Sequence, residues 1–281
     1  MEKGERSMHT ILGSYEELYD ILNVISFFVL LIFNLTQLKS KKDNLSNISL
    51  IFQKKIIKNN KKSKKRKIFS SNTFWATIET IIISCVQYLP TTILNWKFGR
   101  LVGTGANYFG LLFFIPYILL GFCMLLKIDP WKQIDLITPA YPLALVISKI
   151  ACFFAGCCRG IESSFGLYNN YTGLVEFPVQ LVEAGLALFI FVFLMAWRKK
   201  AKPGTMFPIY LIIFSGTRFF SEFFRCEPNV FWGLKTYHIL CIIGIIVGIV
   251  EIFIVKKFGE KISKICTSNI VKKEQSKKSK V

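Results

Sequence analysis

Long apolar runs separated by short polar stretches dominate the hydropathy pattern of this chain. A helix that crosses a bilayer needs about 20 mostly apolar residues, and seven stretches approach that length. We therefore expect an all-α membrane fold, a bundle of seven transmembrane helices within residues 21–255. The expected spans are 21–38, 73–94, 108–126, 136–158, 178–197, 206–224 and 237–255.

Composition agrees with a membrane protein and weakens one alternative. The 281 residues are 52% hydrophobic and include 27 Phe, which is high for a soluble domain. A net charge of +19 would suit a nucleic-acid-binding protein if the basic residues followed one folded face. Here they form short runs between apolar stretches, as in the loops of membrane proteins. We expect an integral membrane protein with no nucleic-acid partner.

The basic runs also predict an orientation. Loops and tail assigned to one side carry 27 Lys and Arg residues, whereas the opposite side carries seven. Because Lys and Arg stay on the cytoplasmic side, residues 1–20 are expected outside and the C-terminus inside. The loop 39–72 and the tail 256–281 are then cytoplasmic. Their Lys-rich, low-complexity parts, 39–67 and the residues after Lys272, are expected to be solvated and disordered.

Eight cysteines follow no disulfide framework of the soluble type. The sequence has no C-x2-C pair, so the spacing does not favour a zinc site, and we expect no metal. Four cysteines should nevertheless lie near the outer face, where disulfides can form. These are Cys152, Cys157, Cys158 and Cys226.

Ionisable residues inside predicted spans are costly and tend to be functional. Helix geometry places Lys149 about 20 Å and Arg218 about 18 Å along their spans from the cytoplasmic side. Glu222 follows Arg218 by one turn on the same face, and Arg225 continues that face. Gln180 and Glu183 lie one or two turns below the outer surface. The charges converge on one layer, either as a purely structural salt-bridge network or as an anion site in which Arg218 and Lys149 hold a phosphate.

Three motifs carry a family resemblance over about residues 105–255. The segment Asp135–Gly160, which ends in Lys149-Ile-Ala-Cys-Phe-Phe-Ala-Gly-Cys-Cys-Arg-Gly, resembles the signature helix of prolipoprotein diacylglyceryl transferases. Phe177-Pro-Val-Gln-Leu-Val-Glu183 resembles that family's Pro-x-Gln-Leu-Tyr-Glu motif. Arg218-Phe-Phe-Ser-Glu-Phe-Phe-Arg225 resembles its Arg-Phe-x-x-Glu-Phe-Phe-Arg helix.

The resemblance implies a multi-pass enzyme of the bacterial cytoplasmic membrane that works without metal or soluble cofactor. The family transfers the diacylglyceryl group of phosphatidylglycerol to the lipobox cysteine of a prolipoprotein signal peptide, and glycerol phosphate leaves. The implied catalytic residues are Arg218, Lys149, Glu222 and Tyr108. The implied substrate-binding residues are Arg225, Gln180, Glu183, Cys152, Gly156 and Gly160.

The chain departs from the family pattern at several positions. Lys149 stands where the signature has Arg, Cys152 where it has Asn, Cys157 where it has an acidic residue, and Tyr108 where a His supplies the base. The family's Trp-Tyr-Gly segment of the first span is also missing from the sequence. Two alternatives therefore stay open beside the transferase. One is a related protein that uses the lipid cavity for other lipid or thiol chemistry, and the other is a non-catalytic lipid-binding protein. The sequence is silent on oligomeric state.

Overall fold

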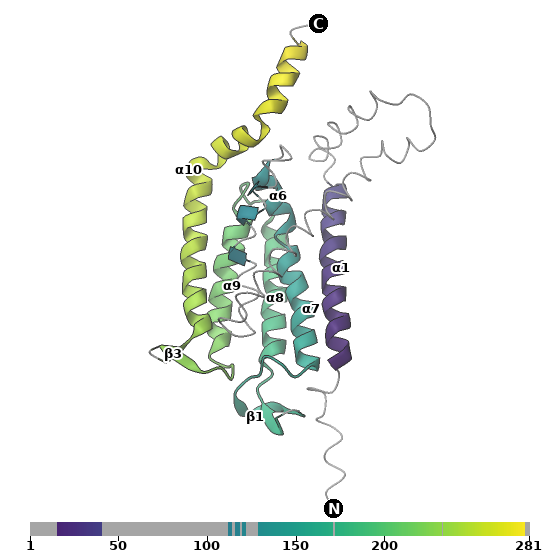
Figure 1. Cartoon of the computed structure of the whole chain (residues 1–281), viewed down its shortest axis with the longest axis vertical. Helices are drawn as coiled ribbons and strands as arrows, with labels where there is room; N and C mark the ends of the chain where they lie inside the picture. The colour runs from purple at the N-terminus through teal and green to yellow at the C-terminus, as the bar shows by residue number, and fades with distance from the viewer. Residues whose placement is uncertain are drawn as a thin grey trace, which may run out of the picture. The chain divides into compact units, whose positions relative to one another are not determined.

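The structure, a computed structural model, describes residues 16–40, 112–113, 116–118, 120–121, 129–170, 172–231 and 233–278. Its principal elements are helices (Figure 1). The helices are α1 (Glu16–Ser40), α6 (Pro130–Ile137), α7 (Ala140–Phe154), α8 (Val179–Trp197), α9 (Met206–Glu222) and α10 (Thr236–Lys278). The strands are β1 (Glu162–Asn169), β2 (Leu174–Glu176), β3 (Asn229–Phe231) and β4 (Leu234–Lys235).

Three of the described segments are long and apolar enough to cross a membrane. They are Pro130–Phe154 with 25 residues, Val179–Trp197 with 19 and Thr236–Ile265 with 30. Apolar side chains that face outward along α8, among them Leu188, Phe189 and Val192, are 47–63% exposed. So wide an apolar surface is typical of contact with lipid rather than with water. The chain is therefore a helical membrane protein.

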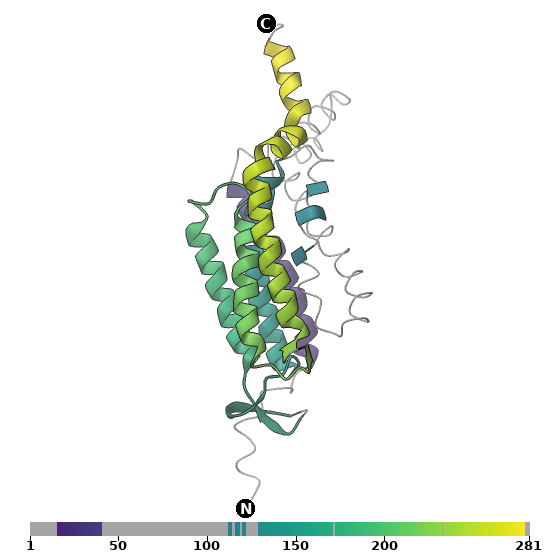
Figure 2. The same cartoon turned by 90° about the vertical axis from the view of Figure 1, so that its left-hand side faces the viewer.

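The described residues form two compact units, and the first holds the charged residues predicted to act together. It comprises residues 1–30, 139–200 and 209–249 in their described parts. In both views α7, α8, α9 and the first part of α10, up to Ile249, run side by side (Figures 1 and 2). Ser26 of α1 donates a hydrogen bond of 2.9 Å to the backbone carbonyl of Ala144 in α7. The buried side of α8 repeats every three or four residues, as a helix facing a bundle requires: Gln180, Glu183, Ala184, Ala187, Ile190 and Leu194.

Two small antiparallel hairpins differ from the all-α expectation. One pairs β1 with β2 and the other pairs β3 with β4. Asn169 is fully buried and donates hydrogen bonds to the Gly156 carbonyl and, over 2.9 Å, to Glu176 Oε2. This buried polar bridge joins the first hairpin to the end of α7. Three of the strands have only two or three residues, and β1, with eight, shows no regular alternation of buried and exposed positions.

The second unit comprises the described parts of residues 31–138, 201–208 and 250–281. Asp129 caps the start of α6 by accepting the backbone N–H of Trp131, and Pro130 occupies the first turn. Trp131 Nε1 donates to the Gly259 carbonyl over 2.7 Å. Asp135 accepts the backbone N–H groups of Gly204 and Met206, at 2.6 and 3.1 Å.

Several predicted boundaries need correction. The predicted span 136–158 is interrupted, because α6 ends at Ile137, α7 begins at Ala140, and α7 ends at Phe154. The tail expected to be disordered after Lys272 continues as helix, since α10 runs to Lys278. Lys and Glu are good helix formers, which favours this extension. The predicted span 73–94 lies outside the described residues, and the span 108–126 is described only in part.

Candidate active site

Glu183, in the first half of α8, is the carboxylate on which three cations converge. Lys149 Nζ lies 2.6 Å from its Oε2 atom. Arg218 Nη1 makes an ion pair with its Oε1 atom, and Arg225 Nη1 lies 3.5 Å from the same atom. The Glu183 side chain is only 5% exposed, so these charges interact with little screening by solvent. The Glu183 carboxylate on α8 thus links α7, which carries Lys149, to the end of α9, where Arg218 and Arg225 lie.

Glu222 supplies a second carboxylate, one turn beyond Arg218 on α9. Its Oε2 atom lies 2.7 Å from Arg218 Nη2 and 3.6 Å from Arg225 Nε. The residue is fully buried. Arg218 is therefore held between two carboxylates, and the ring of Tyr237 lies 5.1 Å from its guanidinium carbon. A guanidinium fixed in this way presents its remaining donors in a set direction.

Lys235 lies beyond the end of α9 in the sequence and fixes the conformation of that end. Its ammonium donates hydrogen bonds to the backbone carbonyls of Glu222, at 2.7 Å, and Arg225, at 2.5 Å. The residue is 8% exposed. Carbonyl groups at a helix C-terminus lack intrahelical partners, and Lys235 donates to that of Glu222, the last residue of α9. It thereby positions Arg225 just beyond the helix.

The cluster of described residues contains more buried cations than buried anions. Glu183 and Glu222 are the two buried carboxylates, and the half-exposed Glu227 lies 3.7 Å from Arg225. The buried cations are Arg218, Arg225 and Lys235, and Lys149, with a side chain 15% exposed, adds a fourth cation. Uncompensated charge is costly at membrane depth. A bound anion would offset it, and Arg forks match phosphate oxygens.

An open hollow of about 650 Å³ adjoins this cluster and is lined by Arg225, Lys235 and His238. His238 Nδ1 accepts the backbone N–H of Lys235 over 3.1 Å. In a neutral ring the proton then sits on Nε2, which makes that atom a hydrogen-bond donor. His238 also packs against the rings of Phe219 and Phe223. The hollow thus offers cations and an N–H donor, together with the half-exposed carboxylate of Glu227.

Gly160 allows the backbone that leaves α7 to pass close to two other segments. It pairs with Arg225 as an antiparallel bridge, and the next amide, of Ile161, donates to the Phe224 carbonyl over 2.9 Å. A Cβ atom on Gly160 would lie 2.1 Å from the Phe177 carbonyl oxygen. Only glycine fits there. Its role in the structure is to place Arg225, not to line the hollow.

The turn after α7 gathers three thiols, those of Cys152, Cys157 and Cys158. Gln180 of α8 holds this turn by donating to the Cys157 carbonyl over 2.7 Å. Hydrogen bonds from the other two thiols to the Cys158 sulfur lower the pKa of Cys158, and the ammonium of Lys149 lowers it further. The turn lies beyond the span that ends at Phe154.

The structure brings together five predicted site residues: Lys149, Glu183, Arg218, Glu222 and Arg225. Gln180 and Gly156 act on the backbone of the turn after α7, since the Gly156 carbonyl accepts a hydrogen bond from Asn169. Cys152 belongs to the thiol group. Tyr108 lies outside the described residues. Sequence reasoning missed Lys235 and Tyr237 as parts of the cluster, because their contacts join segments distant along the chain.

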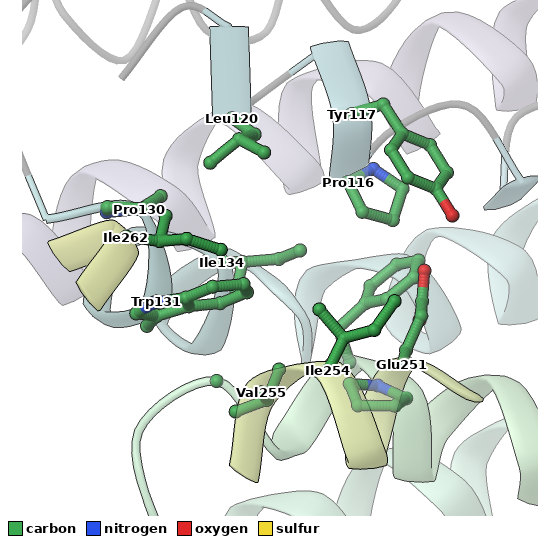
Figure 3. A pocket seen from close by; sticks show the side chains of 13 residues that line it. Pro116, Tyr117, Leu120, Pro130, Trp131, Ile134, Glu251, Ile254, Val255 and Ile262 are labelled. Atoms are coloured by element: carbon green, nitrogen blue, oxygen red, sulfur yellow. The ribbon is translucent and has the colours of Figure 1, made fainter. Parts of the chain in front are cut away.

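A second hollow, in the other unit, has a different character. It has a volume of about 90 Å³ and is lined mainly by apolar side chains of α6 and α10. Figure 3 shows Tyr117 and Glu251 pointing toward the same gap. No Lys or Arg is among the described residues that line it. It therefore lacks the charges that an anionic headgroup needs.

Comparison with known proteins yields relatives of one kind. A relative from Campylobacter curvus is 29% identical over 206 residues, which are 66% of this chain and 76% of that protein. One from Clostridium tetani is 30% identical over 46% of this chain and 55% of its own length. One from Chlorobaculum tepidum is 35% identical over 52% of this chain and 54% of its own. Each is named phosphatidylglycerol–prolipoprotein diacylglyceryl transferase.

The family profile described as prolipoprotein diacylglyceryl transferase matches residues 18–254. This range includes every member of the charged cluster and the turn that carries the three thiols. The resemblance inferred from three motifs is confirmed. The chain belongs to the prolipoprotein diacylglyceryl transferase family.

Proposed function

We propose that this protein transfers the diacylglyceryl group of phosphatidylglycerol to the lipobox cysteine of prolipoproteins. The observation that carries the proposal is the buried surplus of cations around Glu183 and Glu222, beside an open hollow. A purely structural ion-pair network would be expected to balance its charges. The surplus fits a substrate that brings its own negative charge.

The proposal includes a topology and a location. Seven spans, with the N-terminus outside and the C-terminus in the cytoplasm, would put the charged cluster in the outer half of a bacterial cytoplasmic membrane. The distribution of basic residues supports this orientation. Phosphatidylglycerol would enter from the bilayer, and the signal peptide of the prolipoprotein would supply the thiol.

The phosphate of the lipid is held by the cations of the cluster. Arg218 and Lys149 clamp its oxygens, and Arg225 contacts the headgroup from the edge of the open hollow. Glu222 and Glu183 keep the two arginines in place. Fixed donors aimed at developing charge are an effective source of transition-state stabilisation.

The transfer then exchanges one bond for another. The thiolate sulfur attacks the glycerol carbon that bears the phosphate, a C–S bond forms, and the C–O bond breaks with its electron pair on the leaving oxygen. The product is a thioether plus glycerol phosphate. A phosphate monoester has a second pKa of about 6, so the leaving group can carry the thiol proton part of the time, and water takes it otherwise.

Activation of the thiol relies on the cations in this scheme. A tyrosine with an ordinary pKa near 10 is a poor base at neutral pH, so Tyr108 contributes little unless its surroundings shift it. Positive charge near a thiol favours the thiolate, which is the reactive form. The same charges that hold the phosphate would therefore also promote the nucleophile.

Complementation tests the proposal in cells. A strain depleted of its own transferase is given this chain, and lipidation of a reporter prolipoprotein is followed by its electrophoretic mobility. The wild type should restore lipidation, and Arg218→Ala should reduce it at least about 100-fold. Arg218→Lys, which keeps the charge, should retain part of it. Lys264→Ala removes an exposed cation from α10 and serves as the matched control.

Failure of the wild type to lipidate the reporter, despite confirmed insertion in the membrane, would refute the transferase proposal. Saturable binding of phosphatidylglycerol without turnover would then favour a non-catalytic lipid-binding protein. Turnover of a different lipid would favour the related protein with other chemistry. If Arg218→Ala were as active as Lys264→Ala, the charged cluster would have no part in the mechanism.

A further inference from the structure

The turn after α7 has a geometry that the spacing of its cysteines does not reveal. Cys152 lies in the last turn of the helix, and Cys157 and Cys158 follow a glycine. The backbone turns back on itself because Gly156 and Cys158 adopt left-handed conformations, with φ of 66° and 56°. As a result the three sulfur atoms lie within 4.8 Å of one another.

Hydrogen bonds from neighbouring elements fix the conformation of this turn. The buried side chain of Gln180 donates to the Cys157 carbonyl over 2.7 Å, and buried Asn169 donates to the Gly156 carbonyl. A left-handed conformation is unfavourable for a residue with a side chain. Cys158 retains this conformation because Gln180 of α8 and Asn169 of β1 fix the two residues before it.

The sulfur positions match the needs of a thiolate-bound metal ion better than those of a disulfide. A Zn–S bond of about 2.3 Å places two thiolates of a tetrahedral site roughly 3.8 Å apart. A disulfide requires about 2.05 Å between two sulfurs and leaves the third unpaired. The three sulfur atoms lie within 4.8 Å of one another, so small side-chain movements would bring them to the spacing of a metal site.

The charges around the thiols also favour such an ion. Arg225 and Lys149 both lie near enough to Cys158 to interact with it electrostatically. Three thiolates around a divalent ion carry a net charge of −1. The two cations offset that charge.

We propose that Cys152, Cys157 and Cys158 form a three-thiolate binding site for a thiophilic metal cation such as Zn²⁺. Thiolate ligands select soft and borderline ions over Mg²⁺ or Ca²⁺. A water molecule completes the coordination of zinc, since three protein ligands leave one position open. The site does not depend on the transferase proposal, because it rests on the thiols and the turn alone.

Metal titration of the full-length protein tests the site. The reduced protein in detergent is titrated with Cd²⁺, a spectroscopic probe for Zn²⁺, and the thiolate-to-metal charge-transfer absorption is recorded. The site predicts saturation at one equivalent per chain, and competition by Zn²⁺ but not by Mg²⁺. Protection from alkylation, mapped by mass spectrometry, should fall on Cys152, Cys157 and Cys158.

Single Ser substitutions at the three cysteines should each weaken Cd²⁺ binding at least about tenfold. Cys226→Ser changes an exposed thiol outside the group and should leave the affinity unchanged. Because a substitution could disturb folding, the protection pattern of the wild type stands as a separate measurement. Absence of saturable binding, protection of other cysteines, or full affinity in a triple Ser variant would overturn the site.

Discussion

Lys149 on α7 and Glu183 on α8 form a buried ion pair of 2.6 Å between neighbouring helices. Glu183 also pairs with Arg218 of α9, so this carboxylate is the common centre of the cluster. The proposed function gives the cluster two roles: it holds the helices together, and it would present positive charge to a substrate. Predictions for the two roles differ, and separate substitutions can measure them.

Substitutions at Lys149 test its role toward the phosphate. Lys149→Met keeps the length of the side chain and removes the charge, and should lower the rate of lipidation about 100-fold. Lys149→Arg restores a planar donor fork and should keep or raise the rate. Both are measured with a lipobox peptide and phosphatidylglycerol vesicles. Equal rates for Met and Arg at this position would contradict the clamp.

Removal of the central carboxylate tests the structural role. Glu183→Gln leaves Lys149, Arg218 and Arg225 close together without their shared anion. Breaking a buried pair in this way costs about 3–5 kcal/mol, so the melting temperature in detergent should fall by many degrees. Glu260→Gln, at a 94% exposed position, is the control and should melt like the wild type. A stable Glu183→Gln protein would show that the cations do not depend on this carboxylate.

The close approach at Gly160 predicts a defect without any change of charge. Gly160→Ala would place a Cβ atom 2.1 Å from the Phe177 carbonyl oxygen, and the strain should cost about 1–3 kcal/mol. Arg225 pairs with this backbone and would shift with it, so activity should fall as well. Gly185→Ala on α8 meets no atom within 4 Å and should keep both stability and activity. Unchanged activity in Gly160→Ala would contradict the positioning of Arg225.

Lys235 should protect the end of α9 from local opening. Lys235→Met removes the hydrogen bonds to the Glu222 and Arg225 carbonyls, and the amides that follow the helix should exchange faster with solvent. The Cys226 amide, which donates to the Arg159 carbonyl over 2.9 Å, is a suitable reporter by hydrogen-exchange mass spectrometry. Lys264→Met should leave its exchange unchanged. Slow exchange at Cys226 in both variants would contradict the proposed fastening.

Part of the cluster was predictable because it follows from helix periodicity. Arg218 and Glu222 are four residues apart, so they share a face of any helix, and their contact of 2.7 Å agrees with this. The convergence of Lys149 on Glu183 followed from their depths in spans of opposite direction. Both contacts, Arg218–Glu222 and Lys149–Glu183, follow from regular helix geometry within long apolar segments.

Other features depended on backbone detail that the pattern does not contain. The break between α6 and α7 falls at Thr138 and Pro139, inside one apolar run. The three thiols come together because Cys158 adopts a left-handed conformation. Sequence rarely predicts that conformation for a residue other than glycine. Lys235 contacts the Glu222 and Arg225 carbonyls because it lies in the β3–β4 hairpin, whose strands of three and two residues are too short to give a strand pattern.

The most direct test of the account is a reconstituted transfer assay. Purified protein in phosphatidylglycerol vesicles is incubated with a lipobox peptide, and the peptide mass and the released glycerol phosphate are measured together. The account predicts one diacylglyceryl group added to the cysteine for each glycerol phosphate released, and loss of both signals in Arg218→Ala. Lipid binding by the wild type without either product would contradict it.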